Sequence, residues 1–128
     1  MTRQNAIARA ATYYASGLLS ADLARRVALR TESQEEGRLP ELTAYLSEAI
    51  APDVAALGFS TEIFDNPVAG RGPFLIAERH EDSGLPTVLI YGHGDVVRGQ
   101  DTQWREGLGP WTLTIEEGRW YPQMARHC

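Results

Sequence analysis

The nine residues Thr87–Asp95, TVLIYGHGD, carry the strongest fold signal in this sequence. Their apolar run Val88–Ile90 is typical of a strand that is buried on both faces of a sheet. The run breaks at Gly92, and His93 and Asp95 follow with one residue between them. In α/β sheets, ligands and catalytic groups collect just beyond the carboxyl ends of strands. The stretch therefore predicts a central strand that delivers His93 and Asp95 to a functional site.

The spacing of His93 and Asp95 is that of a metal ligand and its orienting partner. Zinc binds a neutral imidazole nitrogen, and a carboxylate can accept the N–H of the other ring nitrogen. On spacing alone, a turn that uses both side chains to satisfy loop backbone is the favoured interpretation. A dinucleotide-binding loop is excluded because Val97 stands where the third glycine belongs and no clear helix follows.

The sequence before this stretch predicts three helices, and the period then changes to that of strands. The helices are expected over residues 3–15, from an N-cap at Ser20, and from about Leu39 to Leu57 with a kink near Ile50. Pro52 is the reason for the kink, since it lacks a backbone N–H. Strands are expected over residues 59–65, 74–79, 87–91, 111–115 and 119–121, with a long loop over 92–110. The predicted fold class is α/β, with helices followed by a mixed sheet of about four to five strands.

Composition narrows the function classes. The chain of 128 residues has a formal net charge of -5, which argues against binding to nucleic acid. No apolar run approaches the roughly 20 residues of a membrane span, and the N-terminal stretch lacks the apolar core of a signal peptide. A cytoplasmic location is therefore expected. The single cysteine, Cys128, excludes an intrachain disulfide.

An ordered series of motifs extends the pattern around His93. They are Gly92-His93-Gly94-Asp95-Val96-Val97, Trp104, Pro110-Trp111 and Gly118-Arg119-Trp120-Tyr121. With the upstream helices and the segment Thr31-Glu32-Ser33, this series resembles the co-catalytic dizinc metallopeptidases and amidohydrolases of the aminoacylase, glutamate carboxypeptidase and desuccinylase type. The resemblance implies that residues 1–121 are a partial catalytic domain, the N-terminal part of a zinc-exopeptidase-type three-layer fold.

The same resemblance assigns roles. His93 corresponds to a ligand of one zinc ion, and Asp95 to the catalytic-site carboxylate that holds its imidazole from behind. In the family, a hydroxide bridging two zinc ions hydrolyses a peptide or N-acyl amide bond, with a Glu as general base. The likeness stops after Tyr121, and residues 122–128 form a tail unlike the family, without the bridging Asp or that Glu. His127 and Cys128 are interpreted as tail residues rather than substitute ligands.

The resemblance therefore predicts a truncated hydrolase, by frameshift or in nature, that is inactive as this chain and binds zinc weakly or not at all. A sheet without its later neighbours should expose a face and an edge, so self-association is expected. Small peptides or N-acyl amino acids would be substrates only if the site were completed. Two alternatives remain: a small non-enzymatic α/β module that binds partners through its open sheet, and an enzyme completed by a separately encoded remainder.

Overall fold

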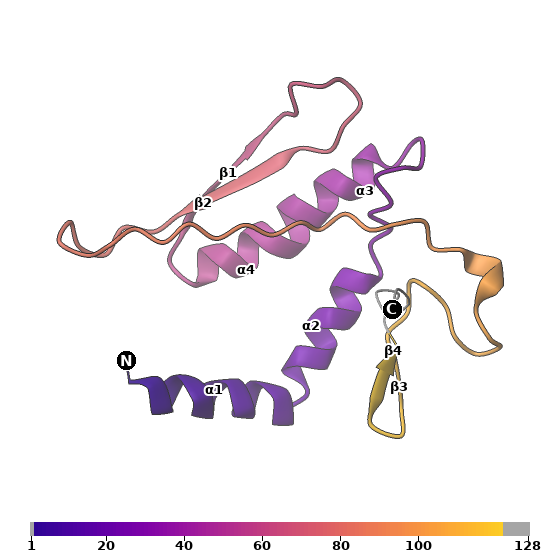
Figure 1. Ribbon diagram of the computed structural model, residues 1–128, viewed down its shortest axis with the longest axis horizontal. Coiled ribbons are helices and arrows are strands. Elements are labelled where there is room, and N and C mark those ends of the chain that lie inside the picture. The colour runs from indigo at the N-terminus through magenta and orange to yellow at the C-terminus, as the bar shows by residue number, and fades with distance from the viewer. Residues whose placement is uncertain (1, 122–128) are drawn as a thin grey trace. The chain divides into compact units, whose positions relative to one another are not determined.

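A computed structural model describes residues 2–121 of the chain (Figure 1). The chain divides into two compact units. The central unit comprises Leu29–Gly99, and the terminal unit combines the chain through Ala28 with the chain from Gln100 onward. Both contain helices and a small antiparallel sheet, so the fold is mixed α/β as the sequence predicts.

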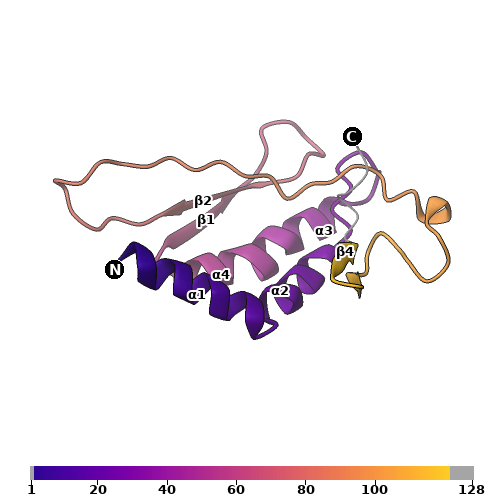
Figure 2. The same cartoon turned by 60° about the horizontal axis from the view of Figure 1, so that its bottom comes forward.

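The central unit is built on a hairpin covered by a helix. Strands β1 (Ser60–Phe64) and β2 (Phe74–Glu78) pair antiparallel, with Phe64 opposite Phe74. Helix α4 (Ala51–Ala56) contacts both strands, and Figures 1 and 2 show it lying alongside the hairpin. Both strand predictions are confirmed to within a residue or two at their ends.

The helix that covers the hairpin changes its winding where a kink was predicted. Residues Leu39–Ala44 form α3, Tyr45–Ile50 form a π-helical segment, η1, and α4 follows without a break. Pro52 cannot donate to the carbonyl four residues earlier, and its ring would crowd that carbonyl in an α-helix. The wider π-helical turns that end at Ile50 are a recognised way to accommodate such an interruption.

In the terminal unit, two helices follow each other closely. Helix α1 (Arg3–Ala15) has the predicted bounds, and its N-cap Thr2 accepts a hydrogen bond from the Asn5 N–H at 3.2 Å. Helix α2 (Leu18–Val27) begins directly after Gly17. The predicted N-cap at Ser20 is therefore wrong: the Ser20 hydroxyl instead donates to the Gly17 carbonyl at 2.8 Å, a bond that Ser makes within a first helical turn.

The terminal unit also contains a hairpin formed by the last two predicted strands. Strands β3 (Thr114–Glu116) and β4 (Arg119–Tyr121) pair antiparallel, so β3 begins three residues later than the sequence predicts. Glu117 and Gly118 connect them with φ angles of 49° and 76°. Two successive positive φ angles define the type I′ turn that matches the twist of a two-residue hairpin. The predicted loop before it contains one short 3₁₀ helix, η2 (Asp101–Gln103).

The predicted central strand is not formed. Residues 87–91 follow β2 in an extended conformation without strand pairing, and Leu89 and Ile90 are 95% and 85% exposed. In Figures 1 and 2 the chain turns back after β2 and then runs as a long extended segment. A strand exists only when neighbouring chain completes its hydrogen-bond ladder, and the described residues provide no such neighbour. The prediction of a mixed sheet of four to five strands is also wrong, since two separate two-stranded antiparallel sheets are present.

Little surface is removed from water in this structure. Apart from Gly99 and Pro110, the only buried apolar residue of the described part is Ala49, at 2% exposure. The accessible surface is 10215 Å². Two compact globules, each with half of the 14.1 kDa mass of the chain, would together expose about 8,100 Å² of surface.

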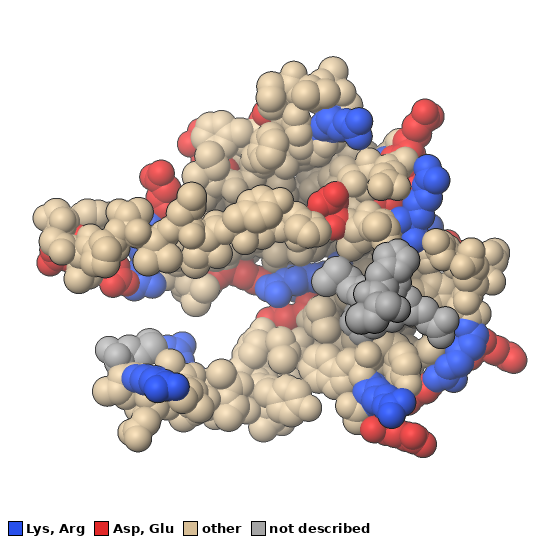
Figure 3. Space-filling view, viewed as in Figure 1, with Lys and Arg blue, Asp and Glu red and all other residues tan. Residues whose placement is uncertain are grey.

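The described helices include none long and apolar enough to cross a membrane. Figure 3 shows acidic and basic side chains interspersed over the face in view.

Candidate metal-ligand site at His93

His93 and Asp95 lie in the extended chain just before the end of the central unit. The Nδ1 atom of His93 is 3.1 Å from Asp95 Oδ1 and 3.2 Å from the carbonyl oxygen of Asp95. The imidazole is 63% exposed. The predicted pair is thus brought together, with the carboxylate placed against one ring nitrogen.

Both groups that face Nδ1 are hydrogen-bond acceptors. A neutral imidazole can donate to them only if its proton is on Nδ1. Its Nε2 atom then carries the free lone pair, which is the form that a metal ion binds. The local geometry therefore selects the tautomer that would present Nε2 as a ligand.

The second oxygen of the Asp95 carboxylate is held by a residue far away in the sequence. The Ser33 hydroxyl donates to Asp95 Oδ2 at 2.7 Å. Thr31 lies beside it and makes two further bonds: its hydroxyl donates to the Gly94 carbonyl at 2.6 Å, and its own carbonyl accepts from the Val96 N–H at 2.9 Å. Together these contacts attach the stretch that carries His93, residues 93–99 (the His93 segment), to residues 31–33.

Gly94 occupies a position that has no space for a side chain. A Cβ atom built there would lie 2.0 Å from Cε1 of Tyr45, well inside contact distance. The Tyr45 ring comes from the π-helical segment, so the helix that covers the hairpin also approaches the His93 segment.

Glu32 completes the attachment from a buried position. It is 4% exposed and pairs with Val96 as an isolated parallel bridge. Its Oε1 atom accepts the Gly99 N–H at 2.7 Å. Its Oε2 atom lies 3.4 Å from Arg38 Nε and 3.5 Å from an Arg30 guanidinium nitrogen. Two guanidiniums thus balance a carboxylate that would be costly to bury alone.

The ligand set around His93 is small. Between residues 2 and 121 there is no group of three or more His, Cys, Asp or Glu side chains that could hold a metal ion. His80 is exposed in its loop. His127 and Cys128 lie outside the described residues.

The site also includes residues that the sequence did not point to. The segment Thr31-Glu32-Ser33 was named from the sequence only as part of the resemblance. Apart from the approach of Tyr45, these three residues make all the long-range contacts of the His93 segment described above. The signal in the sequence was a polar triplet directly after an apolar helix. Its partners lie 62 to 67 residues further along the chain, beyond the reach of local patterns.

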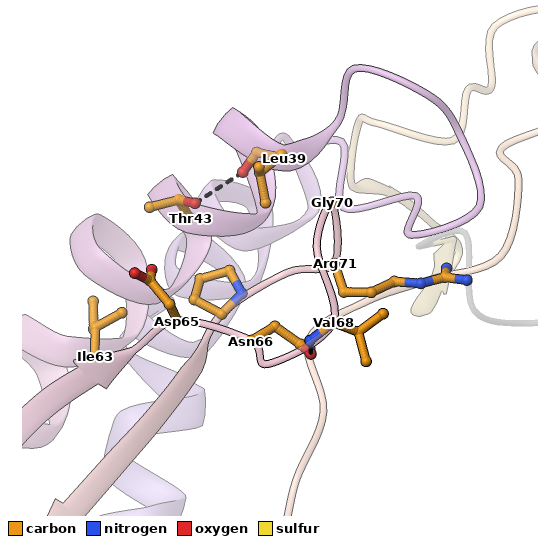
Figure 4. A pocket seen from close by; sticks show the side chains of 9 residues that line it. Leu39, Thr43, Ile63, Asp65, Asn66, Val68, Gly70 and Arg71 are labelled. Atoms are coloured by element: carbon orange, nitrogen blue, oxygen red, sulfur yellow. Dashed lines mark hydrogen bonds between the residues drawn. The ribbon is translucent and has the colours of Figure 1, made fainter.

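A separate pocket lies near the connection between β1 and β2 (Figure 4). It has a volume of about 340 Å³ and includes neither His93 nor Asp95. Figure 4 shows the Arg71 guanidinium pointing away from it, and its Thr43 hydroxyl donates to the Leu39 carbonyl at 2.9 Å. Asp65 is the acidic residue in its lining. This mixture of groups indicates no particular chemistry.

Searches of protein-family models, of curated proteins and of solved structures return no significant match to this chain.

Proposed function

We propose that this chain carries one ligand arm of a zinc-dependent amidohydrolase or peptidase of the aminoacylase type, and that it does not hydrolyse substrate by itself. The arm consists of His93 as the metal ligand and Asp95 as its orienting carboxylate. The reaction class, hydrolysis of a peptide or N-acyl amide bond, and the three-layer family fold are what the resemblance implies. A cytoplasmic setting is part of the proposal.

One observation carries this proposal: Asp95 presents two acceptors to Nδ1 of His93. That contact leaves Nε2 as the basic nitrogen, on a ring that is 63% exposed and open to an incoming ion. A His that only satisfied loop backbone would have no need of a carboxylate that is itself held by Ser33. Such a supporting carboxylate is typical of metal-binding histidines.

A complete dizinc centre does not fit the described residues. Catalytic zinc sites use three protein ligands for one ion, and two ions need bridging carboxylates in addition. The described residues bring a single imidazole to this place. The His93 arm would therefore need ligands from elsewhere before it could support turnover.

Zinc titration of the metal-free protein tests the ligand assignment. We expect weak binding of one zinc ion, its loss in His93→Ala, and a decrease in affinity of about tenfold in Asp95→Asn. His80→Ala is the matched control, since it removes an exposed histidine elsewhere. The measurements are made with His127 and Cys128 both replaced by Ala, so that the tail cannot contribute. Equal affinity in the wild-type and His93→Ala proteins would refute the assignment.

An activity assay tests the second part of the proposal, that the chain does not hydrolyse substrate by itself. N-acyl amino acids and dipeptides, with added zinc, should show no turnover above the rate in buffer. Clear zinc-dependent hydrolysis that His93→Ala abolishes would mean that the chain completes its own site.

The exposed segment Val88–Tyr91 favours a second candidate function. Four consecutive apolar residues in an extended chain without strand pairing form an open edge of the kind that pairs with another chain. The protein could accordingly be a non-enzymatic module that associates with a second copy of itself through this segment.

A further inference from the structure

The most buried polar residues of the described chain lie beside the His93 segment. Thr31 and Glu32 are 3% and 4% exposed, close to the 2% of Ala49. Charged side chains are rarely buried unless a partner requires them. The burial of Glu32 therefore calls for an explanation in terms of what it holds.

Glu32 holds the far end of the His93 segment. Thr31 and Ser33 bind at Gly94, Asp95 and Val96, all near the histidine. Glu32 reaches further and accepts the buried N–H of Gly99 at 2.7 Å. Residues 94–99 are thus attached at both ends. Asp95 lies inside this span, and His93 directly precedes the span, so the attachment holds the carboxylate that faces Nδ1 of His93.

The carboxylate is suited to this role by its charge as well as its shape. Arg38 and Arg30 lie 3.4 and 3.5 Å from its second oxygen, so two positive charges face the carboxylate. An ionised acceptor makes a stronger bond to a backbone N–H than a neutral one does. The arginines come from the chain on both sides of Glu32, which keeps the carboxylate directed at Gly99.

We propose that Glu32 is a positioning residue for the His93–Asp95 pair: by binding the Gly99 amide, it holds the segment in the register that keeps Nδ1 of His93 protonated and Nε2 free. This role rests on the proposed function of His93 as a ligand. It concerns the metal-free protein, however, so it is tested without zinc. Failure to bind zinc would count against the ligand assignment alone.

The experiment compares wild-type, Glu32→Ala, Glu32→Gln and the control Glu62→Ala, which removes an exposed carboxylate on β1. Amide hydrogen exchange reports the attachment of Gly99 and Val96. Nitrogen-15 NMR of the His93 ring reports which nitrogen carries the proton, a property that a merely structural role would not change. Exchange in β1 and β2 reports whether the central unit is still folded.

In Glu32→Ala we expect exchange at Gly99 to accelerate by about tenfold or more, because a buried donor loses its acceptor. The His93 ring should shift toward the Nε2–H tautomer that free histidine prefers. Glu32→Gln keeps a carbonyl oxygen for Gly99 and should restore both readouts, and Glu62→Ala should match the wild type. An unchanged His93 tautomer in a folded Glu32→Ala protein would overturn the proposal.

If Glu32→Ala also loses protection from hydrogen exchange in β1 and β2, the central unit has unfolded, and the Glu32→Gln variant then tests the positioning role. Retained protection at Gly99 together with the wild-type tautomer supports the positioning role. Retained protection at Gly99 with a changed tautomer overturns it, because the attachment would then not control the ring.

Discussion

The chemistry of this chain depends on a few polar contacts at single residues. Asp95 faces Nδ1 of His93, Ser33 holds Asp95, and Glu32 holds the segment that carries both. We propose that each contact supports the next, from a buried carboxylate to the tautomer of the His93 ring. An imidazole prepared in this way is more useful to a metal ion than one free to adopt either tautomer.

Gly94 provides a direct test of the packing beneath this pair. In Gly94→Ala the new Cβ would meet the Tyr45 ring at 2.0 Å, so ring or chain must shift. We expect a loss of about 1–3 kcal/mol in the free energy of unfolding, measured by urea denaturation. Gly92→Ala is the matched control, because nothing lies within 4 Å of a Cβ at that position.

The double variant Tyr45→Ala/Gly94→Ala identifies the source of the loss. If the ring is responsible, the two substitutions should be less destabilising together than the sum of their separate effects. Strict additivity would show that Gly94 is needed for a reason other than Tyr45.

At the scale of elements, short-range rules explain most of what is formed. Helix α1 and the strands of the hairpin β3–β4 were predicted, and the structure adds the Thr2 cap and the type I′ turn. The helix over the hairpin adapts to Pro52 by forming a π-helical segment. These features depend on neighbours within a few residues, which is why the sequence reveals them.

The start of α3 gives a pH-dependent prediction. The pKa of Glu41 is lowered from 4.5, first by a hydrogen bond from its own backbone N–H and then by Arg38, whose guanidinium donates to it at 2.8 Å. A lowered pKa in the folded state means that the ionised form stabilises the fold. The contribution is complete above pH 4.5 and is lost as the pH falls through the lowered pKa.

Carbon-13 NMR of the side-chain carboxyl should place the midpoint of Glu41 below 4.5. In Glu41→Gln, this component of the pH dependence of unfolding should be missing. A midpoint at or above 4.5 would mean that the backbone and Arg38 do not stabilise the carboxylate in solution.

At the scale of the whole molecule, the main feature is the large apolar surface that remains exposed to solvent. The surface of 10215 Å² exceeds what two separate compact globules of the same total mass would leave open, about 8,100 Å². Four of the exposed large apolar side chains are contiguous in sequence at Val88–Tyr91. Folded chains with such segments tend to remove them from water by association.

Self-association should therefore depend on Leu89. We expect light scattering to show a mass that rises with protein concentration, and Leu89→Lys to weaken the association by about tenfold, the equivalent of losing one buried Leu side chain. Val68→Lys is the control, since it alters an exposed apolar residue in a different loop. A wild-type protein that stays monomeric at high concentration would contradict the second candidate function.

The sequence by itself determined the local elements and the pairing of His93 with Asp95, because helix caps, tight turns and contacts two residues apart depend only on neighbouring chain. Only the tertiary structure decided that Thr31, Glu32 and Ser33 hold that pair, since their partners lie more than 60 residues away. It also decided that residues 87–91 remain outside any sheet. An apolar run shows that a segment is able to be a strand, but a strand forms only where another chain segment completes its hydrogen bonds.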